Sequence, residues 1–136
     1  MSIYTEITLK NAADEGIASS GLAKNYQVRQ TTINALVDTG AWTLIINEET
    51  RKKLGLKKLE TKLGTFSDDS ITEYCVAGPV KVIWNNRHFN CDAIVLPDVD
   101  DILLGAIPLD AMDLTVHPNK EKVVGAHGDK ELHRIR

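Results

Sequence analysis

A single aspartate stands where a carboxylate is hard to accommodate. Asp38 follows the apolar residues 35–37 directly and is followed by Thr39 and Gly40. Burying such a charge is costly unless hydrogen bonds or a shared proton stabilise it. Gly40 lets the backbone turn sharply and approach another chain, and Thr39 places a hydroxyl beside the acid. Asp38 is therefore either a hydrogen-bonded turn residue or a reactive acid, and the tripeptide alone leaves both open because Asp and Gly are common in turns.

The elements that must position this aspartate read mostly as strands. The chain is 43% hydrophobic but only 5% aromatic, so its core must come mainly from Val, Ile and Leu. Alternating polar and apolar residues predict strands, and polar turn residues separate them. We expect strands over residues 1–10, 26–37, 43–46, 59–66, 71–76, 80–84, 88–96, 114–116 and 122–124. The length and pattern predict one mostly-β domain.

Helix signals are few. Asn47 is a good N-cap, acids follow it, and Gly55 is placed to end a helix of about two turns. Residues 108–112 can form one further helical turn, directly after an apolar run that ends in Gly105. Residues 11–24 are small and polar, so we expect a loop there. One or two short helices are therefore predicted.

Composition excludes several classes of function. The net charge is -3 and basic residues are mixed with acids, so nucleic acid is not an expected partner. No apolar run is long enough to span a bilayer, so no membrane partner is expected either. The cysteines and histidines fit no metal motif, and we predict no metal and no cofactor. Free thiols at the two cysteines point to a reducing, cytoplasmic location. These residues are Cys75, Cys91, His88, His117, His127 and His133.

The order of the motifs resembles one family. Asp38-Thr39-Gly40, a short helix, a hairpin around a polar turn, residues 102–105 (Ile-Leu-Leu-Gly) and a second helical turn follow one another as in retropepsin-like aspartic peptidases. The resemblance is to the single-domain members found outside retroviruses. It implies an all-β acid-protease half-barrel with a flap hairpin and one lobe per chain. The domain is expected over residues 1–124, with a polar C-terminal tail over residues 125–136.

The resemblance also implies a reaction. A water activated between two aspartates would hydrolyse a peptide bond, one carboxylate acting as general base and the other as acid. Two carboxyl groups at ~3 Å share one proton, because both cannot ionise. The sequence has one Asp-Thr-Gly motif, so the second aspartate is expected from a second copy of the chain. The prediction is an aspartic endopeptidase that is active as a homodimer on peptide or protein substrates.

Residue roles follow from the family pattern. Asp38 is the expected acid and base, Thr39 would hydrogen-bond across the dimer axis, and Gly40 would present backbone to the substrate. Leu104 and Gly105 are expected to support the aspartate loop from behind. Substrate contacts are expected beside the motif and at the flap tip. These candidates are Ala41, Trp42, Phe66, Ser67, Asp68 and Asp69, with Ile71 as a further pocket wall. Core packing remains the alternative for Trp42, Phe66 and Ile71.

Three departures from the family pattern leave alternatives open. Trp42 stands where retroviral members commonly have an acid, and the flap tip carries Asp68 and Asp69 in place of glycines, which should repel acidic peptides. The tail does not read as a strand, so the dimer would use residues 122–124 or a different edge. A catalytically silent peptide-binding or dimerisation module on the same fold is the alternative function. A β-barrel binding domain with a chance tripeptide is a third. Because Met1 lies almost directly before the first strand, we expect no propeptide.

Overall fold

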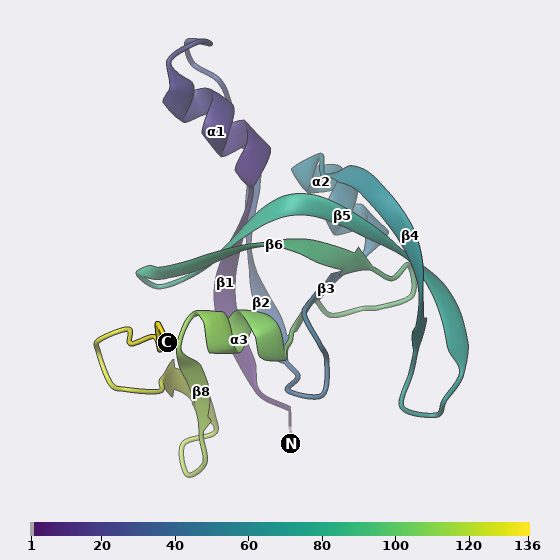
Figure 1. The fold of residues 1–136 in the computed structure, drawn as a ribbon, viewed down its shortest axis with the longest axis vertical. Coiled ribbons are helices and arrows are strands. Elements are labelled where there is room, and N and C mark those ends of the chain that lie inside the picture. Colours follow the sequence, from purple (N-terminus) through teal and green to yellow (C-terminus); the bar gives the residue numbers. More distant parts are fainter. Residues whose placement is uncertain (1) are drawn as a thin grey trace.

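The chain folds around one curved β-sheet. A computed structural model describes residues 2–136, so Met1 of the predicted first strand and domain lies outside the described residues (Figure 1). Seven strands form the sheet in the order β1-β2-β7-β3-β6-β5-β4, and β1 also pairs with β5, which curls the sheet into a half-barrel. A second sheet holds β8 and β9. The strands are β1 Tyr4–Asn11, β2 Gln30–Val37, β3 Leu44–Ile46, β4 Lys57–Thr65, β5 Ile71–Trp84, β6 Arg87–Val95, β7 Leu103–Leu104, β8 Leu114–His117 and β9 Lys122–Gly125.

The core is aliphatic, as the composition predicted. On β1 the alternating residues Ile7 and Leu9 are fully buried, while Thr8 between them bonds the hydroxyl of Thr32 on the neighbouring strand. The fully buried apolar side chains of the described residues are Ala, Val, Ile, Leu and Met, together with Pro108, and none is aromatic. Close packing of such side chains makes the core rigid. It therefore offers a stiff base for the loop that follows β2.

The segment that supports the aspartate threads between two strands. β7 runs parallel to β2 and antiparallel to β3, so it lies between the strands on either side of the aspartate loop. The N–H of Leu36 donates to the carbonyl of Ile102 at 2.8 Å, and the N–H of Asp38 donates to the carbonyl of Leu104 at 3.1 Å. Residues 102–104 thus run directly beside the residues that lead into the aspartate loop.

Two hairpins confirm the predicted turns. β4 and β5 pair antiparallel as a long hairpin whose tip is the polar turn, and β5 continues into a second hairpin with β6 through Asn85. At the tip, Phe66 and Ser70 close the turn by a backbone hydrogen bond of 3.1 Å, and Asp69 adopts a left-handed φ of 64°. Asn and Asp tolerate that conformation better than most residues. We call β4, the turn and the facing part of β5 the flap.

The structure has three helices, and two of them were predicted from the sequence. Helix α2 (Glu48–Leu54) begins at Asn47, whose side chain accepts the N–H of Thr50 at 2.8 Å, and ends at Gly55 with a φ of 62°. Helix α3 (Ala106–Ala111) begins two residues before the predicted turn. Helix α1 (Ala12–Ser20) was not expected, and the prediction of a loop at residues 11–24 is wrong.

Buried hydrogen bonds explain α1. Asn11 caps it by accepting the N–H of Asp14, and the buried carboxylate of Asp14 accepts the backbone N–H and the guanidinium of Arg29 at 2.8–3.0 Å. The hydrogen bond from Arg29 lowers the pKa of Asp14 despite its burial. This pair holds the connection between β1 and β2 closed at its base. The composition of the segment, small and polar, hides these long-range contacts.

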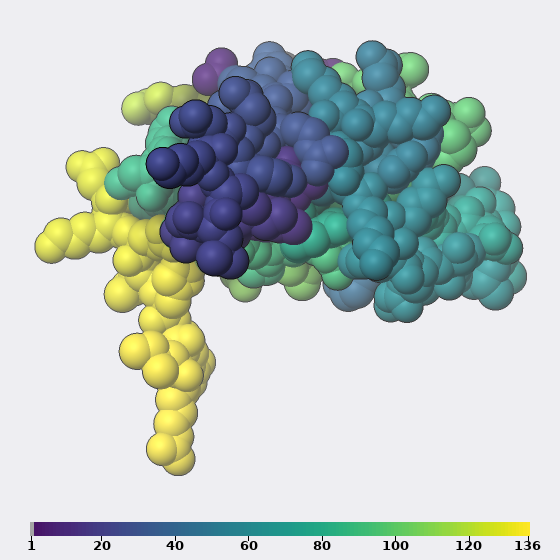
Figure 2. Space-filling view, turned by 90° about the horizontal axis from the view of Figure 1, so that it is seen from above, coloured from purple at the N-terminus to yellow at the C-terminus, as the bar shows by residue number. Residues whose placement is uncertain are grey.

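The C-terminal residues continue past β9 without regular structure. They form an arm that projects from the body (yellow in Figure 2). Arg87, buried at the start of β6, donates to the carbonyls of Asp113 and Gly128 at 2.7 and 2.9 Å. Asp113 in turn accepts the N–H of Leu132 and bonds the ring of His127. The base of the arm is therefore anchored. Within residues 2–136 no helix has both the length and the apolar character needed to cross a membrane.

Candidate active site

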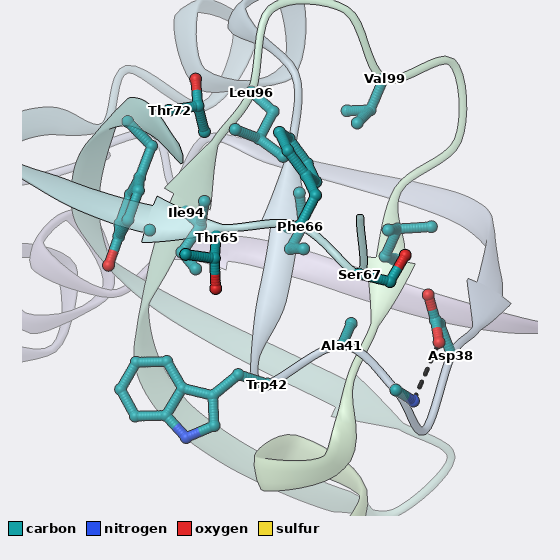
Figure 3. A pocket seen from close by; sticks show the side chains of 15 residues that line it. Asp38, Ala41, Trp42, Thr65, Phe66, Ser67, Thr72, Ile94, Leu96 and Val99 are labelled. Carbon is teal, nitrogen blue, oxygen red and sulfur yellow. Dashed lines mark hydrogen bonds between the residues drawn. The ribbon is translucent and has the colours of Figure 1, made fainter. Parts of the chain in front are cut away.

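A pocket of about 500 Å³ lies between the aspartate loop and the flap (Figure 3). Residues from three regions of the chain line it, and side chains of β3, β6 and the segment that leads into β7 form its apolar floor. The loop supplies Asp38, Gly40, Ala41 and Trp42; the flap supplies Gly64, Thr65, Phe66, Ser67, Thr72 and Tyr74; the floor comprises Ile45, Ile94, Leu96, Val99 and Leu103. Asp38 is the only residue among them that carries a formal charge at neutral pH.

Asp38 is held in place by backbone hydrogen bonds. Its own N–H is fixed to Leu104, and its carbonyl accepts the N–H of Ala41 at 3.0 Å. One carboxylate oxygen, Oδ1, accepts the N–H of Gly40 at 2.9 Å, the dashed line in Figure 3. The side chain is only partly buried and faces the pocket. Hydrogen bonds of this kind fix the direction of a carboxylate.

Gly105, behind the aspartate loop, is packed too tightly against it to carry a side chain. A Cβ on Gly105 would lie 2.6 Å from the carbonyl oxygen of Ala41 and 2.8 Å from the nitrogen of Thr43, and closer still to the carbonyl oxygen of Thr43. Helix α3 starts directly after it and donates the N–H of Ala106 to Ala41 at 2.9 Å. Leu104 is fully buried in the same layer. Both residues predicted to support the loop thus lie against its rear side.

Six of the predicted catalytic and substrate-binding residues meet in this pocket and three do not. Asp38, Gly40, Ala41, Trp42, Phe66 and Ser67 line it. Thr39 lies in the loop but is exposed, and Asp68 and Asp69 occupy the turn beyond the lining. Ile71, the further candidate, is 71% exposed and is not part of the wall. In this single chain the flap tip therefore reaches the pocket through Phe66 and Ser67 alone.

Asp68 is engaged within the flap turn itself. Its carboxylate accepts the N–H of Ser70 at 2.9 Å. The hydrogen bonds from Ser70 hold the pKa of Asp68 below its ordinary value. The turn is therefore negatively charged at neutral pH. Its acids shape and charge the tip of the flap rather than the pocket below it.

The floor of the pocket was missed by sequence reasoning. Ile45, Ile94 and Leu96 lie in segments that were predicted as strands, but a strand pattern does not say which strands pack together. Because β3 and β6 pair in parallel although many residues separate them in the chain, their side chains meet on one face. Tyr74, which also lines the pocket, could have been proposed as an aromatic residue on a predicted strand of the flap hairpin.

Trp42 marks the boundary of a second pocket. Its indole is 65% exposed and points away from Asp38 in Figure 3. Beyond it lies a hollow of about 320 Å³ that shares Trp42, Tyr74 and Ile94 with the first pocket. Core packing, the alternative considered for this side chain, does not apply.

Among the described residues, no group of three or more His, Cys, Asp or Glu side chains is placed to hold a metal ion.

The fold and site together define a retropepsin-like protein. The solved structure of EIAV protease complexed with the inhibitor HBY-793 matches with a TM-score of 0.52 and 20% identity, over 81% of this chain and 86% of the other. The profile of a family described as Aspartyl protease matches residues 25–106. The chain belongs to this family. None of the curated proteins compared with it matches. The predicted family and the all-β, single-lobe fold are confirmed.

Proposed function

We propose that the protein is an aspartic endopeptidase whose active site forms between the Asp38 carboxylates of two copies of the chain. The observation that carries this proposal is the placement of Asp38. It is a partly buried carboxylate, oriented by backbone hydrogen bonds, at the edge of a pocket that a flap covers. The sequence holds one Asp-Thr-Gly motif, and hydrolysis by a shared water needs two aspartates. The second has to come from a partner with two-fold symmetry.

The reaction needs only the two carboxyl groups and water. One carboxylate removes a proton from the water, and the other carboxyl group donates a proton to the carbonyl oxygen of the scissile bond. The oxygen of the water bonds to the carbonyl carbon, and the bond to the leaving nitrogen then breaks as the first carboxyl group passes its proton to that nitrogen. The second carboxyl group recovers its proton from the former carbonyl oxygen, so both return to their starting states. Two carboxyl groups close together share one proton, which keeps one in each state.

The surrounding residues support binding of an extended peptide. Such a peptide would run between the flap and the aspartate loop and place alternate side chains in the apolar pocket. Phe66 and Ser67 would contact it from the flap, and Gly40 and Ala41 from the loop. Exposed Thr39 is free to hydrogen-bond across the dimer axis. Domain bounds at residues 1–124, with the tail outside, form part of this proposal, as does a cytoplasmic location, which suits the free thiols of Cys75 and Cys91.

A subunit-mixing experiment tests the shared site. The protein and its Asp38→Asn variant are each assayed against a diverse peptide library from acidic to neutral pH, and the oligomeric state is measured by sedimentation. We expect the wild-type dimer to cleave and the variant dimer to be inactive. After subunit exchange in an equal mixture, activity should fall to about one quarter of that of the same total amount of wild type, because both aspartates are needed.

The other outcomes contradict the proposal in distinct ways. Activity of one half in the mixture would mean that each chain works alone. Cleavage by a monomer would have the same meaning. A folded dimer that binds peptides but cleaves none at any pH would favour the catalytically silent module, for which the acidic, glycine-free flap tip is the specific observation.

A further inference from the structure

We propose that the second pocket is a substrate subsite for a lysine or arginine side chain, with the indole of Trp42 as its platform. The inference rests on the proposed function, because one extended peptide would fill both pockets. It assigns the substrate a pattern: a bulky apolar side chain beside Asp38 and a basic side chain further along the same side of the peptide.

The two pockets form one continuous surface. They share Trp42, Tyr74 and Ile94, so the two pockets adjoin along these three side chains. The backbone of Trp42 is fixed, since its carbonyl accepts the N–H of Ile107 at 3.0 Å. Its indole is nevertheless mostly exposed. A large aromatic side chain that is held at its base and open on its face can stack against a ligand.

Charge separates the second pocket from the first. The first contains no ionisable side chain at neutral pH except Asp38. The second is lined by the carboxylates of Glu60 and Asp92 and the amine of Lys62. Lys62 pairs with Glu60 at 3.3 Å, which leaves the carboxylate of Asp92 in excess. A cation is therefore favoured here and an anion is repelled.

The remaining lining suits the stem of a long basic side chain. Val76, Phe89 and Ile107 supply apolar surface below the charged rim. Lysine and arginine bury their methylene groups on such surfaces while the charged head stays near carboxylates and water. The same head is attracted to the face of a tryptophan. Alternate side chains of an extended peptide point to the same side, so the apolar and basic residues would be separated by an even number of positions.

A position-scanning library tests the proposal. Peptides with one fixed apolar residue carry Arg, Gln or Glu at each flanking position, and kcat/KM is measured for the wild-type dimer. We expect one position at which Arg exceeds Gln by about tenfold, with Glu poorest of the three. Asp92→Asn should lower the Arg-to-Gln ratio about threefold, and Trp42→Leu about fivefold. Glu73→Gln is the matched control, because Glu73 lies on the flap but lines neither of these two pockets.

Direct binding separates this inference from the function on which it rests. Affinity of the same peptides for the Asp38→Asn dimer is measured by calorimetry, so no cleavage is needed. Binding in the order Arg, Gln, Glu without cleavage by the wild type would keep the subsite and reject the protease. Equal affinities, or ratios that Asp92→Asn leaves unchanged, would overturn the subsite. Loss of the dimer in Trp42→Leu on sedimentation, with the Arg-to-Gln ratio unaltered, would overturn it too and would assign Trp42 to the interface between copies.

Discussion

Replacing Gly105 with alanine should disturb the site without touching a functional side chain. Gly105 is in extended backbone with a φ of -90°, which alanine adopts freely, so conformation is not the obstacle. The added methyl group would instead collide with main-chain atoms of Ala41 and Thr43. Main-chain atoms cannot rotate aside as a flexible side chain does. The collision must be relieved by moving either β7 and α3 or the aspartate loop.

The structure sets the size of the effect. Overpacking of this kind costs ~1–3 kcal/mol, and alanine returns ~0.4–1 kcal/mol by restricting the unfolded chain. Because all three colliding atoms belong to the backbone, we expect a net loss of about 2 kcal/mol in the free energy of unfolding. At ~4 °C per kcal/mol for a domain of this size, Tm should fall by about 8 °C. A shift of the loop by ~1 Å would lower kcat/KM by about 100-fold.

A second glycine provides the matched control. Gly16 lies within α1, and a Cβ there would meet nothing within 4 Å. Gly16→Ala should raise the free energy of unfolding by about 0.5–1 kcal/mol through helix propensity and leave cleavage unchanged. Thermal and chemical denaturation at one fixed protein concentration, together with peptide cleavage, measure both variants. If Gly105→Ala unfolds and cleaves like the wild type, the supposed rigidity of the loop and its backing is refuted.

Three further predictions concern groups outside the pocket. Asp14→Asn should lower the free energy of unfolding by about 1–2 kcal/mol in urea denaturation, since it breaks a pair in which Arg29 is half exposed; no change would contradict the pair. Burial alone would raise the pKa of Asp113, but the hydrogen bonds from His127 and Leu132 and the nearby positive charge outweigh burial and lower this pKa. The carboxylate of Asp113 therefore contributes its full stabilisation above pH ~4 and loses it as the pH falls through the lowered pKa. Asp113→Asn should flatten that acid limb of stability against pH, and an unaltered limb would refute the assignment. Burial raises the pKa of the Cys91 thiol to about 12, so very little of this partly buried thiol is thiolate at neutral pH. In a Cys75→Ser variant a thiol reagent should therefore react with native protein much more slowly than with the urea-unfolded chain, and equal rates would contradict the raised pKa.

Local sequence patterns correctly predicted the helix ends and turns, because these depend on residues close together in the chain. The cap at Asn47, the stop at Gly55 and the turns at the flap tip and Asn85 each depend on residues within a few positions of one another, and the structure has them where the sequence placed them. The aspartate loop and its apolar backing were predicted together because both motifs were present in order. Secondary structure can be predicted from sequence where the local signals agree with one another and with the fold.

Features that depend on contacts between residues far apart in the chain could not be predicted from these patterns. Helix α1 depends on Asp14 meeting Arg29 and on Asn11 donating to the carbonyl of Leu54 in another helix, and no local pattern reveals either contact. The pocket floor depends on β3 lying beside β6, which only the sheet order shows. The acidic turn was placed at the flap tip correctly, yet Asp68 and Asp69 do not reach the pocket. A turn pattern in the sequence does not show which of its side chains will face the pocket.

The closed base of the connection between β1 and β2 makes that segment exchangeable. Lys10 and Gln30 are direct partners across the two strands, so the chain leaves the sheet at one point and returns beside it. Everything between them, including α1, lies at the opposite end of β2 from Asp38, about 25 Å along the strand. A reporter domain could therefore be inserted beyond α1, leaving the Asp14–Arg29 pair and Asp38 in place. The same geometry allows this connection to change in length without displacing Asp38.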